Sequence, residues 1–263
     1  MYENDNLPKL KNEGLYDSDF EHDACGVGLV ANIKGEKSHK MIEDGLDALC
    51  HLGHRGASGA DPETGDGAGL LCQIPHIFFK NMANKSSITI PDAGEYGIGM
   101  VFIPNDSNTH KQYINIISDI CESEGFDLIW WRDVPIRPNT IGVLANKVRP
   151  RIYQFFVTKK NIDSIIDTDL FILRRSIEKK VLEDITNSED FYICSLSTKT
   201  IVYKGLFIPE QLERFYPDLS DATFISSFAL VHSRFSTNTM GSWKLAHPYR
   251  YVVHNGEINT LKG

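Results

Sequence analysis

The sequence predicts an α+β domain in which largely antiparallel sheets are covered by helices. Short apolar strands recur along the chain, hairpin-like links join some of them, and the helical patterns come in pairs. The chain has no internal repeat, low-complexity segment or Pro/Ser-rich linker. Its 263 residues are enough for one large domain or two small ones, with a substantial buried core.

The N-terminal residues are expected to form a leader followed by a strand. Residues 1–24 show neither a helical nor a strand period and are interpreted as a loose leader. Residues 25–33 read CGVGLVANI and alternate as a strand does, with one face formed by Cys25, Val27, Leu29 and Ala31. The first strand therefore begins at a cysteine.

A helix and a glycine-rich loop are expected next. Apolar residues three and four apart predict a helix from Met41 to Leu52, which Ser38 can cap and Gly53 can end. Residues 54–71 read HRGASGADPETGDGAGLL, and such frequent glycines predict a long loop that enters a strand.

The rest of the chain alternates strands with two long helices. The helices are expected over residues 107–125 and 169–185, the first with Tyr113, Ile116, Ile117 and Ile120 facing inward. Strands are expected over residues 96–104, 126–134, 151–158, 191–197, 200–206, 223–233 and 249–255. The very short polar turn after residue 197 predicts that the strands on either side of it pair as a hairpin.

Composition and charge exclude several classes of function. The formal net charge is −8 and no long basic run is present, which argues against nucleic acid or an anionic membrane as a partner. No apolar stretch approaches the roughly 18–20 residues of a membrane span. The N-terminus lacks the apolar core of a secretory signal and is acidic, unlike a transit peptide. A cytoplasmic location is therefore expected.

The chain has five cysteines, and their spacing argues against a metal site or a disulfide framework. The number is odd and no CxxC pair occurs, so zinc, iron–sulfur and disulfide arrangements are not expected. Apolar surroundings predict core thiols at Cys50, Cys72, Cys121 and Cys194. Cys25 differs because it stands at the start of a strand beside a glycine.

Three places in the sequence suggest chemistry, although each also has an ordinary interpretation. Cys25 alone would be a core thiol, and Arg234 at a strand end would be a solvated charge or an ion pair. Asn255 and Gly256 alone would form a type I′ turn. The GDGAG run enters a strand instead of opening a helix, which does not fit a phosphate site, and the HLGH pair at a helix end has no third ligand nearby.

Together, four segments of the chain resemble a known family. They are CGVGLVANI, HLGHRGASGADPETGDGAG, HSRFSTNT and HNGEINTLKG, and the likeness runs from about residue 20 to residue 263. They resemble the class II, N-terminal nucleophile type, glutamine amidotransferase domain of glutamate synthase large subunits. Within that class, the glycine-rich motif and the separation of 209 positions between Cys25 and Arg234 (234 − 25) resemble those of glutamate synthases. The resemblance implies a four-layer α/β/β/α sandwich over residues 25–263, with residues 1–24 as the leader.

The resemblance implies that Cys25 is the nucleophile. In this family a short leader is removed, so the cysteine becomes the N-terminal residue and its free α-amine acts as the base. An α-amine has a pKa near ~8, against ~10.4 for lysine, so it can be neutral at working pH and accept the thiol proton, directly or through a water. The thiolate then attacks the carboxamide of glutamine, ammonia leaves, and water releases glutamate from a thioester.

Two further residues match the family's oxyanion hole. The side-chain amide of Asn255 and the backbone N–H of Gly256 would both point at the developing oxyanion. One such donor typically lowers the barrier by about 3–4 kcal/mol. Glycine also allows the backbone to approach the substrate closely.

Other residues match the part of the family's site that binds glutamine. Arg234 matches the arginine that holds the α-carboxylate, for which a planar guanidinium is better suited than an ammonium. Thr237 and His232 are assigned supporting roles in substrate binding. Arg55 and the glycine-rich loop are expected to shape the pocket and its lid.

The resemblance also implies parts that the given sequence does not contain. The family holds the glutamine α-amine with an aspartate downstream of the Asn-Gly pair, and the sequence ends at Gly263 before any such residue. The domain is therefore expected to be incomplete at its C-terminal end. No cofactor and no metal are expected in this chain, because flavin and the iron–sulfur cluster belong to the missing parts of the parent enzyme. The expected partners are L-glutamine and the remainder of a glutamate synthase, including its synthase domain.

Two other functions are compatible with these residues. The chain could be a folded but catalytically incompetent module with only an interaction role. It could also be another class II amidotransferase that makes amino sugars, purine precursors or asparagine, although the glycine-rich motif argues against this.

Overall fold

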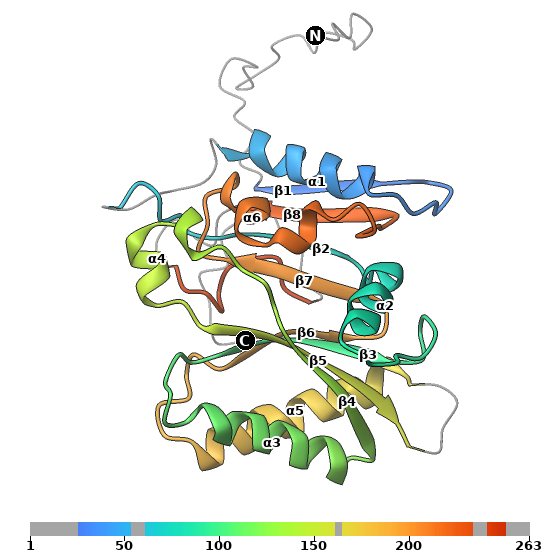
Figure 1. The fold of residues 1–263 in the computed structure, drawn as a ribbon. Helices are drawn as coiled ribbons and strands as arrows, with labels where there is room; N and C mark the ends of the chain where they lie inside the picture. The colour runs from blue at the N-terminus through green and yellow to red at the C-terminus, as the bar shows by residue number, and fades with distance from the viewer. Residues whose placement is uncertain (1–25, 54–60, 161–164, 234–240, 251–263) are drawn as a thin grey trace, which may run out of the picture.

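The computed structural model describes residues 26–53, 61–160, 165–233 and 241–250. These residues form two four-stranded sheets in which all neighbouring strands are antiparallel. Helices pack against both sheets (Figure 1). The prediction of an α+β fold with largely antiparallel sheets is confirmed.

The first sheet brings together strands from the two ends and the middle of the chain. Its order is β1–β8–β2–β7, where the strands are β1 (Val27–Ala31), β2 (Ala68–Gln73), β7 (Thr200–Gly205) and β8 (Phe228–Ser233). In the described part of the sheet, β1 is an edge strand. The face of β1 that carries Val27, Leu29 and Ala31 is partly open to solvent. Leu29 on that face is 65% exposed.

The second sheet has the order β4–β5–β3–β6. Its strands are β3 (Gly97–Ile103), β4 (Phe126–Asp133), β5 (Arg151–Lys159) and β6 (Tyr192–Ser197). Every residue of β3 is buried, because this inner strand is covered on both faces. These strands lie where the sequence pattern predicts them.

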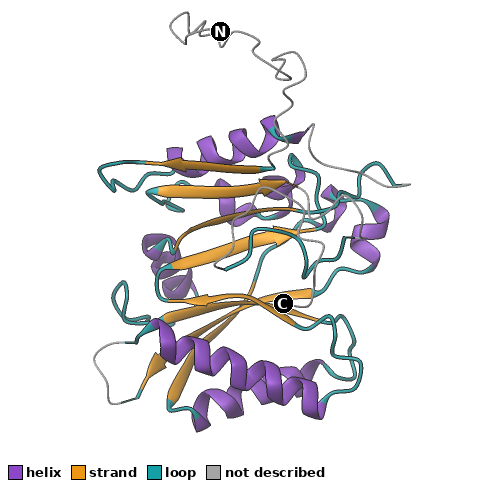
Figure 2. Ribbon diagram, turned by 180° about the vertical axis from the view of Figure 1, so that it is seen from behind, coloured by secondary structure: helices purple, strands orange, loops and turns teal. Residues whose placement is uncertain are grey.

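Two long helices cover the outer face of the second sheet. They are α3 (His110–Ser123) and α5 (Asp167–Asp184), and they lie side by side in both views (Figures 1 and 2). Tyr113 and Ile117 of α3 are buried in the core cluster beneath them, as predicted, while Ile116 and Ile120 are partly buried at its margin.

At the opposite end of the molecule, α1 (Lys40–His51) packs against β1 and β8. The helix lies close to β8 because a Cβ atom on Gly45 would be 2.5 Å from the Cβ atom of Ala229. The predicted N-cap is wrong: the backbone of Ser38 instead pairs with Ser226 in an isolated bridge, which leaves His39 at the cap position. From top to bottom, Figure 1 shows α1, the first sheet, the second sheet, and α3 with α5, the layer order that the resemblance implies.

Several short elements are not indicated by the sequence pattern. They are α2 (His76–Lys85), α4 (Val143–Lys147), α6 (Gln211–Phe215) and the 3-10 turns η3 (Pro138–Thr140) and η4 (Pro217–Ser220). Most have five residues or fewer, which is too short for a helical period to show. Among the described residues, no helix has the length and apolar character needed to cross a membrane.

The predicted hairpin between residues 191–197 and 200–206 is wrong. Both segments are strands, but β6 pairs with β3 in the second sheet and β7 pairs with β2 in the first. The hydroxyl oxygen of Ser197 accepts hydrogen bonds from the backbone N–H groups of Lys199 and Thr200, at 3.0 and 3.3 Å. This tight turn carries the chain from the edge of one sheet to the edge of the other.

Three of the four predicted core thiols are confirmed. Cys72, Cys121 and Cys194 are buried, and burial raises the pKa of Cys121 and Cys194 to about 12. The prediction for Cys50 is wrong, because this thiol is exposed. It follows the buried Leu49 directly on α1, and one residue along a helix turns the side chain by about 100°, away from the sheet.

A buried polar network joins the two sheets. The guanidinium of Arg132 on β4 donates to both carboxylate oxygens of Asp218 on η4, each at 2.7 Å. Gln154 on β5 accepts from Arg132 at 2.8 Å and donates to the phenol oxygen of Tyr203 on β7 at 2.9 Å. Tyr203 in turn donates to Asp218 at 2.8 Å, which closes the network. The larger core cluster surrounds it with apolar residues from both sheets.

Candidate active site

Most of the predicted site residues lie outside the described part of the chain. These are Cys25, Arg234, Thr237, Asn255 and Gly256, together with Arg55 and residues 251–255 of the strand expected at 249–255. The structure does describe the residues to which they are joined, and it describes His232.

The pairing of β1 with β8 brings two of the predicted segments together. The register places Val27 opposite His232, and the N–H of Ser233 donates to the carbonyl oxygen of Gly26 at 2.7 Å. A Cβ atom on Gly26 would lie 2.2 Å from the carbonyl oxygen of Ser233, so no larger residue fits there. Gly26 is bonded to Cys25 and Ser233 to Arg234. The attachment points of these distant residues are therefore neighbours.

The described end of the glycine-rich loop forms a packing surface for residues 241–250. A Cβ atom on Gly69 would lie 2.4 Å from the carbonyl oxygen of His247, and one on Gly67 would lie 2.9 Å from the Cβ atom of Ala246. Gly67 also has a φ of +139°, a backbone conformation that favours glycine. These glycines let the segment that leads toward Asn255 lie directly on β2.

Trp243 anchors the start of this segment. Its side chain is buried, and its indole N–H donates to the carbonyl oxygen of Ala145 at 3.0 Å. The indole ring lies 5.3 Å from the ring of Phe207 and 5.9 Å from that of Phe102, both edge-on. Residues after Trp243 are therefore held close to both sheets.

Lys204 on β7 holds the middle of the segment. Its side chain is fully buried, and its Nζ donates to the carbonyl oxygen of Lys244 at 2.8 Å. The same Nζ lies 4.4 Å from the ring centroid of Tyr192 and 4.8 Å from that of Tyr249. Burial lowers the pKa of Lys204 to about 7.

His232 is the one residue assigned a substrate-binding role that the structure describes. It is buried on β8, and its ring lies 4.3 Å from the ring of His247, which itself lies 4.2 Å from the ring of Tyr249. His232 therefore contributes to the surface that supports residues 241–250. Its role in binding glutamine stays a prediction.

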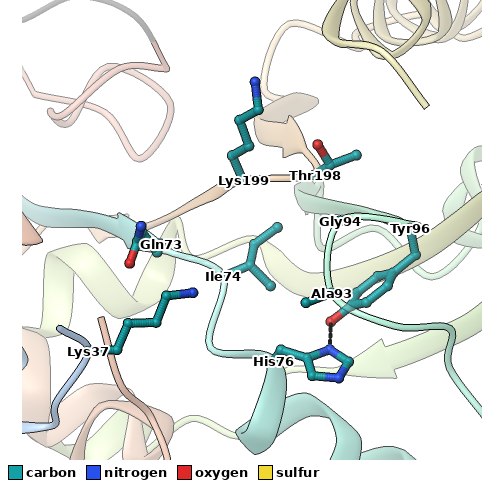
Figure 3. Close-up of a pocket in the computed structure, with 9 residues that line it drawn as sticks. All are labelled: Lys37, Gln73, Ile74, His76, Ala93, Gly94, Tyr96, Thr198 and Lys199. Carbon is teal, nitrogen blue, oxygen red and sulfur yellow. Dashed lines mark hydrogen bonds between the residues drawn. The ribbon is translucent and has the colours of Figure 1, made fainter. Parts of the chain in front are cut away.

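A small pocket lies at the far end of the first sheet. It has a volume of about 230 Å³, and its lining includes Lys37, Gln73, His76, Tyr96 and Lys199 (Figure 3). Gln73 is five residues along β2 from Ala68, which pairs with Ser233, so the pocket is about 17 Å from the end that carries Cys25. Figure 3 shows Lys199 directed away from the hydrogen-bonded His76 and Tyr96. The pocket therefore lies at the opposite end of β2 from Ala68, the residue that pairs with Ser233.

Comparison with known families extends over the whole of the predicted domain. The family model of class II glutamine amidotransferases matches residues 25–263. The chain belongs to this family. The amidotransferase match begins at Cys25 and includes every residue to which the sequence assigns a catalytic or substrate-binding role.

The amidotransferase domain is similar to parts of several glutamate synthases. It is 47% identical to the glutamate synthase [NADPH] large chain of Bacillus subtilis, over 98% of this chain and 17% of that protein. It is 44% identical to the corresponding large chain of Azospirillum brasilense, over 98% and 17%. It is 42% identical to the chloroplastic ferredoxin-dependent glutamate synthase 2 of Arabidopsis thaliana, over 97% and 16%. The chain thus spans about a sixth of the length of these relatives.

Three residues that support the amidotransferase segment 241–250 are not indicated by the sequence motifs. Lys204, Trp243 and Tyr249 received no role, although a signal for Lys204 is present. It lies two residues after the apolar Val202 in a predicted strand, and residues two apart share a face. A lysine on the same face as a core valine indicates either a strand end or a buried cation.

Proposed function

We propose that this chain is the glutaminase part of a glutamate synthase. It hydrolyses glutamine to glutamate and ammonia, and the ammonia passes to a synthase part that makes glutamate from 2-oxoglutarate. The observation that carries the proposal is the 47% identity to a glutamate synthase large chain over 98% of this chain. The chain spans only 17% of that relative, so the proposal assigns it the glutaminase reaction and not the synthase reaction.

The reaction starts from Cys25 after removal of residues 1–24. The freed α-amine accepts the thiol proton, and the sulfur attacks the carboxamide carbon of glutamine to form a C–S bond and an oxyanion. The α-ammonium returns the proton to the amide nitrogen, and collapse of the intermediate breaks the C–N bond and releases ammonia. Water then cleaves the thioester, which restores the thiol and releases glutamate. The start of the family match at Cys25 supports this role.

The remaining residues bind glutamine and stabilise the oxyanion. Asn255 and the N–H of Gly256 donate to the oxyanion, and Arg234 holds the α-carboxylate with support from Thr237 and His232. The hydrogen bond between Ser233 and Gly26 supports this arrangement, because it fixes the chain next to Arg234 beside the chain next to Cys25.

The purified full-length protein tests this proposal. Its intact mass should show loss of residues 1–24, and the glutamine analogue diazo-oxo-norleucine should label Cys25. Cys25→Ala should abolish glutamine hydrolysis, whereas Cys50→Ala, which removes an exposed thiol, should leave it unchanged. An enzyme that keeps its leader and retains activity in Cys25→Ala would overturn the mechanism.

Calorimetry with glutamine separates this function from a purely interacting module. An active glutaminase should bind glutamine in the Cys25→Ala variant, because that change leaves Arg234 in place. No heat with glutamine, combined with retained association with a synthase partner, would favour the catalytically incompetent module.

A further inference from the structure

Lys204 is a buried cation without an acidic partner among the described residues. Its side chain is 0% exposed, and none of the ion pairs in the described structure includes it. Removing an ammonium from water without a counter-charge costs several kcal/mol. A buried lysine at such a position is a candidate for a role other than stabilising the fold.

The groups that face Lys204 offer its charge only partial compensation. Burial raises the pKa of the Cys194 thiol to about 12, so that thiol stays neutral, and the Arg250 guanidinium repels the ammonium. Among the described residues, the phenol rings of Tyr192 and Tyr249 also face the ammonium, and burial raises the pKa of both. The hydroxyl of Tyr216, whose pKa burial also raises, donates to the backbone carbonyl oxygen of Lys204. The favourable contacts are therefore two aromatic faces and one carbonyl oxygen.

Two of these three contacts lie in residues 244–249, and the third, the ring of Tyr192, is on β6. The ammonium donates to the carbonyl oxygen of Lys244 and lies over the ring of Tyr249, while the phenol of Tyr249 donates to the carbonyl oxygen of Leu245 at 3.0 Å. Arg250 extends the arrangement, because its guanidinium lies 5.2 Å from the ring centroid of Tyr192 and donates to the carbonyl oxygen of Ile193. One side chain on β7 thus fixes both ends of the stretch that precedes Asn255 and Gly256.

We propose that Lys204 is a positioning residue for glutamine hydrolysis. Its ammonium holds residues 244–249 against the first sheet and so sets the place of the oxyanion donors that follow them in the chain. This role rests on the proposed glutaminase function. It acts on the transition state more than on substrate binding, because the donors meet the oxyanion only after attack.

Lys204→Met tests this role in the purified full-length protein, because methionine keeps most of the apolar stem and removes the charge. We expect kcat for glutamine hydrolysis to fall about 100-fold, the size of effect that a small misplacement of reacting groups can produce. The KM for glutamine should change little. Thermal unfolding should occur at an unchanged or higher temperature, because the variant lacks a buried cation that has no acidic partner among the described residues.

The pH profile gives a second readout that a purely structural lysine would not move. Because the pKa of Lys204 is lowered to about 7, the ammonium is present below that pH and is lost above it. The ratio of wild-type kcat to Lys204→Met kcat should therefore be largest near about pH 6 and should shrink toward about pH 9. The matched control is Lys199→Met in the turn between β6 and β7, whose side chain is 74% exposed and pairs with Asp167. It should give a flat ratio near one.

A second variant keeps the test informative if Lys204→Met does not fold. Tyr249→Leu removes one aromatic face from the ammonium at a half-buried position and should also lower kcat with little change in KM. A folded Tyr249→Leu or Lys204→Met enzyme with wild-type kcat and pH profile would overturn the positioning role. A wild-type enzyme that does not hydrolyse glutamine would instead overturn the glutaminase function itself.

Discussion

Asp218 compensates the buried charge of Arg132, and this pair carries a prediction at the scale of single residues. Both side chains are less than a tenth exposed and form a two-pronged ion pair. Asp218→Ala leaves the guanidinium buried with Gln154 as its remaining polar partner in the network and removes the acceptor of Tyr203. We expect the free energy of unfolding of the chain to fall by about 3–5 kcal/mol, measured by urea denaturation.

The control for this prediction is an ion pair at the surface. Asp92 lies 3.9 Å from Lys80, and its side chain is 83% exposed. Asp92→Ala should change the free energy of unfolding by less than about 1 kcal/mol. Equal effects of the two substitutions would show that the network around Arg132 is not the tie between the sheets that its geometry indicates.

Buried polar residues were also the hardest to predict from the sequence. Arg132 follows Trp130 and Trp131 in a strand, and Lys204 shares a strand face with the apolar Val202, but such a pattern fits a solvated charge at a strand end as well as a buried one. Whether such a charge can be buried depends on its hydrogen-bond partner. The partner of Arg132 is 86 residues away in the sequence, and the partner of Lys204 is 40 residues away. Burial of charge is therefore a tertiary property that periodicity alone does not show.

At the scale of elements, the contact between β2 and residues 241–250 depends on Gly69. A Cβ atom there would meet the carbonyl oxygen of His247, the Cβ atom of Lys204 and the Cδ atom of Pro248, all within 2.9 Å. Gly69→Ala should therefore push the segment off the strand. We expect a loss of about 1–3 kcal/mol in the free energy of unfolding. We also expect a fall in kcat for glutamine hydrolysis larger than any change in KM.

Gly53→Ala is the matched control for Gly69→Ala. The nearest atom to a Cβ on Gly53 is the Oε1 atom of Glu210 at 3.4 Å, an ordinary contact with the end of a flexible side chain. This variant should retain wild-type stability and kcat. If Gly69→Ala behaved in the same way, the seating of residues 241–250 on β2 would not matter for the reaction.

The elements show which parts of a fold a sequence predicts well. The strands and the two long helices follow from apolar periodicity, which operates within each segment. The predicted hairpin between β6 and β7 is wrong because strand pairing depends on which strand edges are available in the folded chain. Here β6 pairs with the edge of β3, and β7 pairs with the edge of β2. The predicted cap at Ser38 is also wrong because of a contact that is distant in sequence: the backbone of Ser38 forms an antiparallel bridge with Ser226.

At the scale of the whole molecule, the site could be predicted from the sequence only because four separate motifs matched one family. No local pattern joins Cys25 to a residue 209 positions later. The antiparallel register of β1 and β8 supplies that connection, and it brings Gly26 beside Ser233. The positions of the catalytic side chains themselves stay a prediction, because they lie outside the described residues.

The larger core cluster predicts how the whole molecule unfolds. It contains Leu71 and Val202 from the first sheet and Met100 and Phe156 from the second. Neither sheet can lose its packing without exposing apolar surface of the other, so the chain should unfold in one cooperative transition. The network around Arg132 reinforces this coupling, because it joins β4, β5 and β7.

The three tryptophans provide the measurement. Trp243 reports on the core between the sheets, where it packs on Phe207 and on Phe102, whereas Trp131 reports on the second sheet, where it packs on Phe155. A variant that keeps only Trp243 and one that keeps only Trp131, with phenylalanine at the other positions, should each give the same urea midpoint by fluorescence and by far-UV circular dichroism. Each variant serves as its own control, since both signals come from one sample. A fluorescence midpoint that departs from the dichroism midpoint in either variant would show that the sheets unfold separately. In that case, the shared core would not couple the surface beneath residues 241–250 to the second sheet.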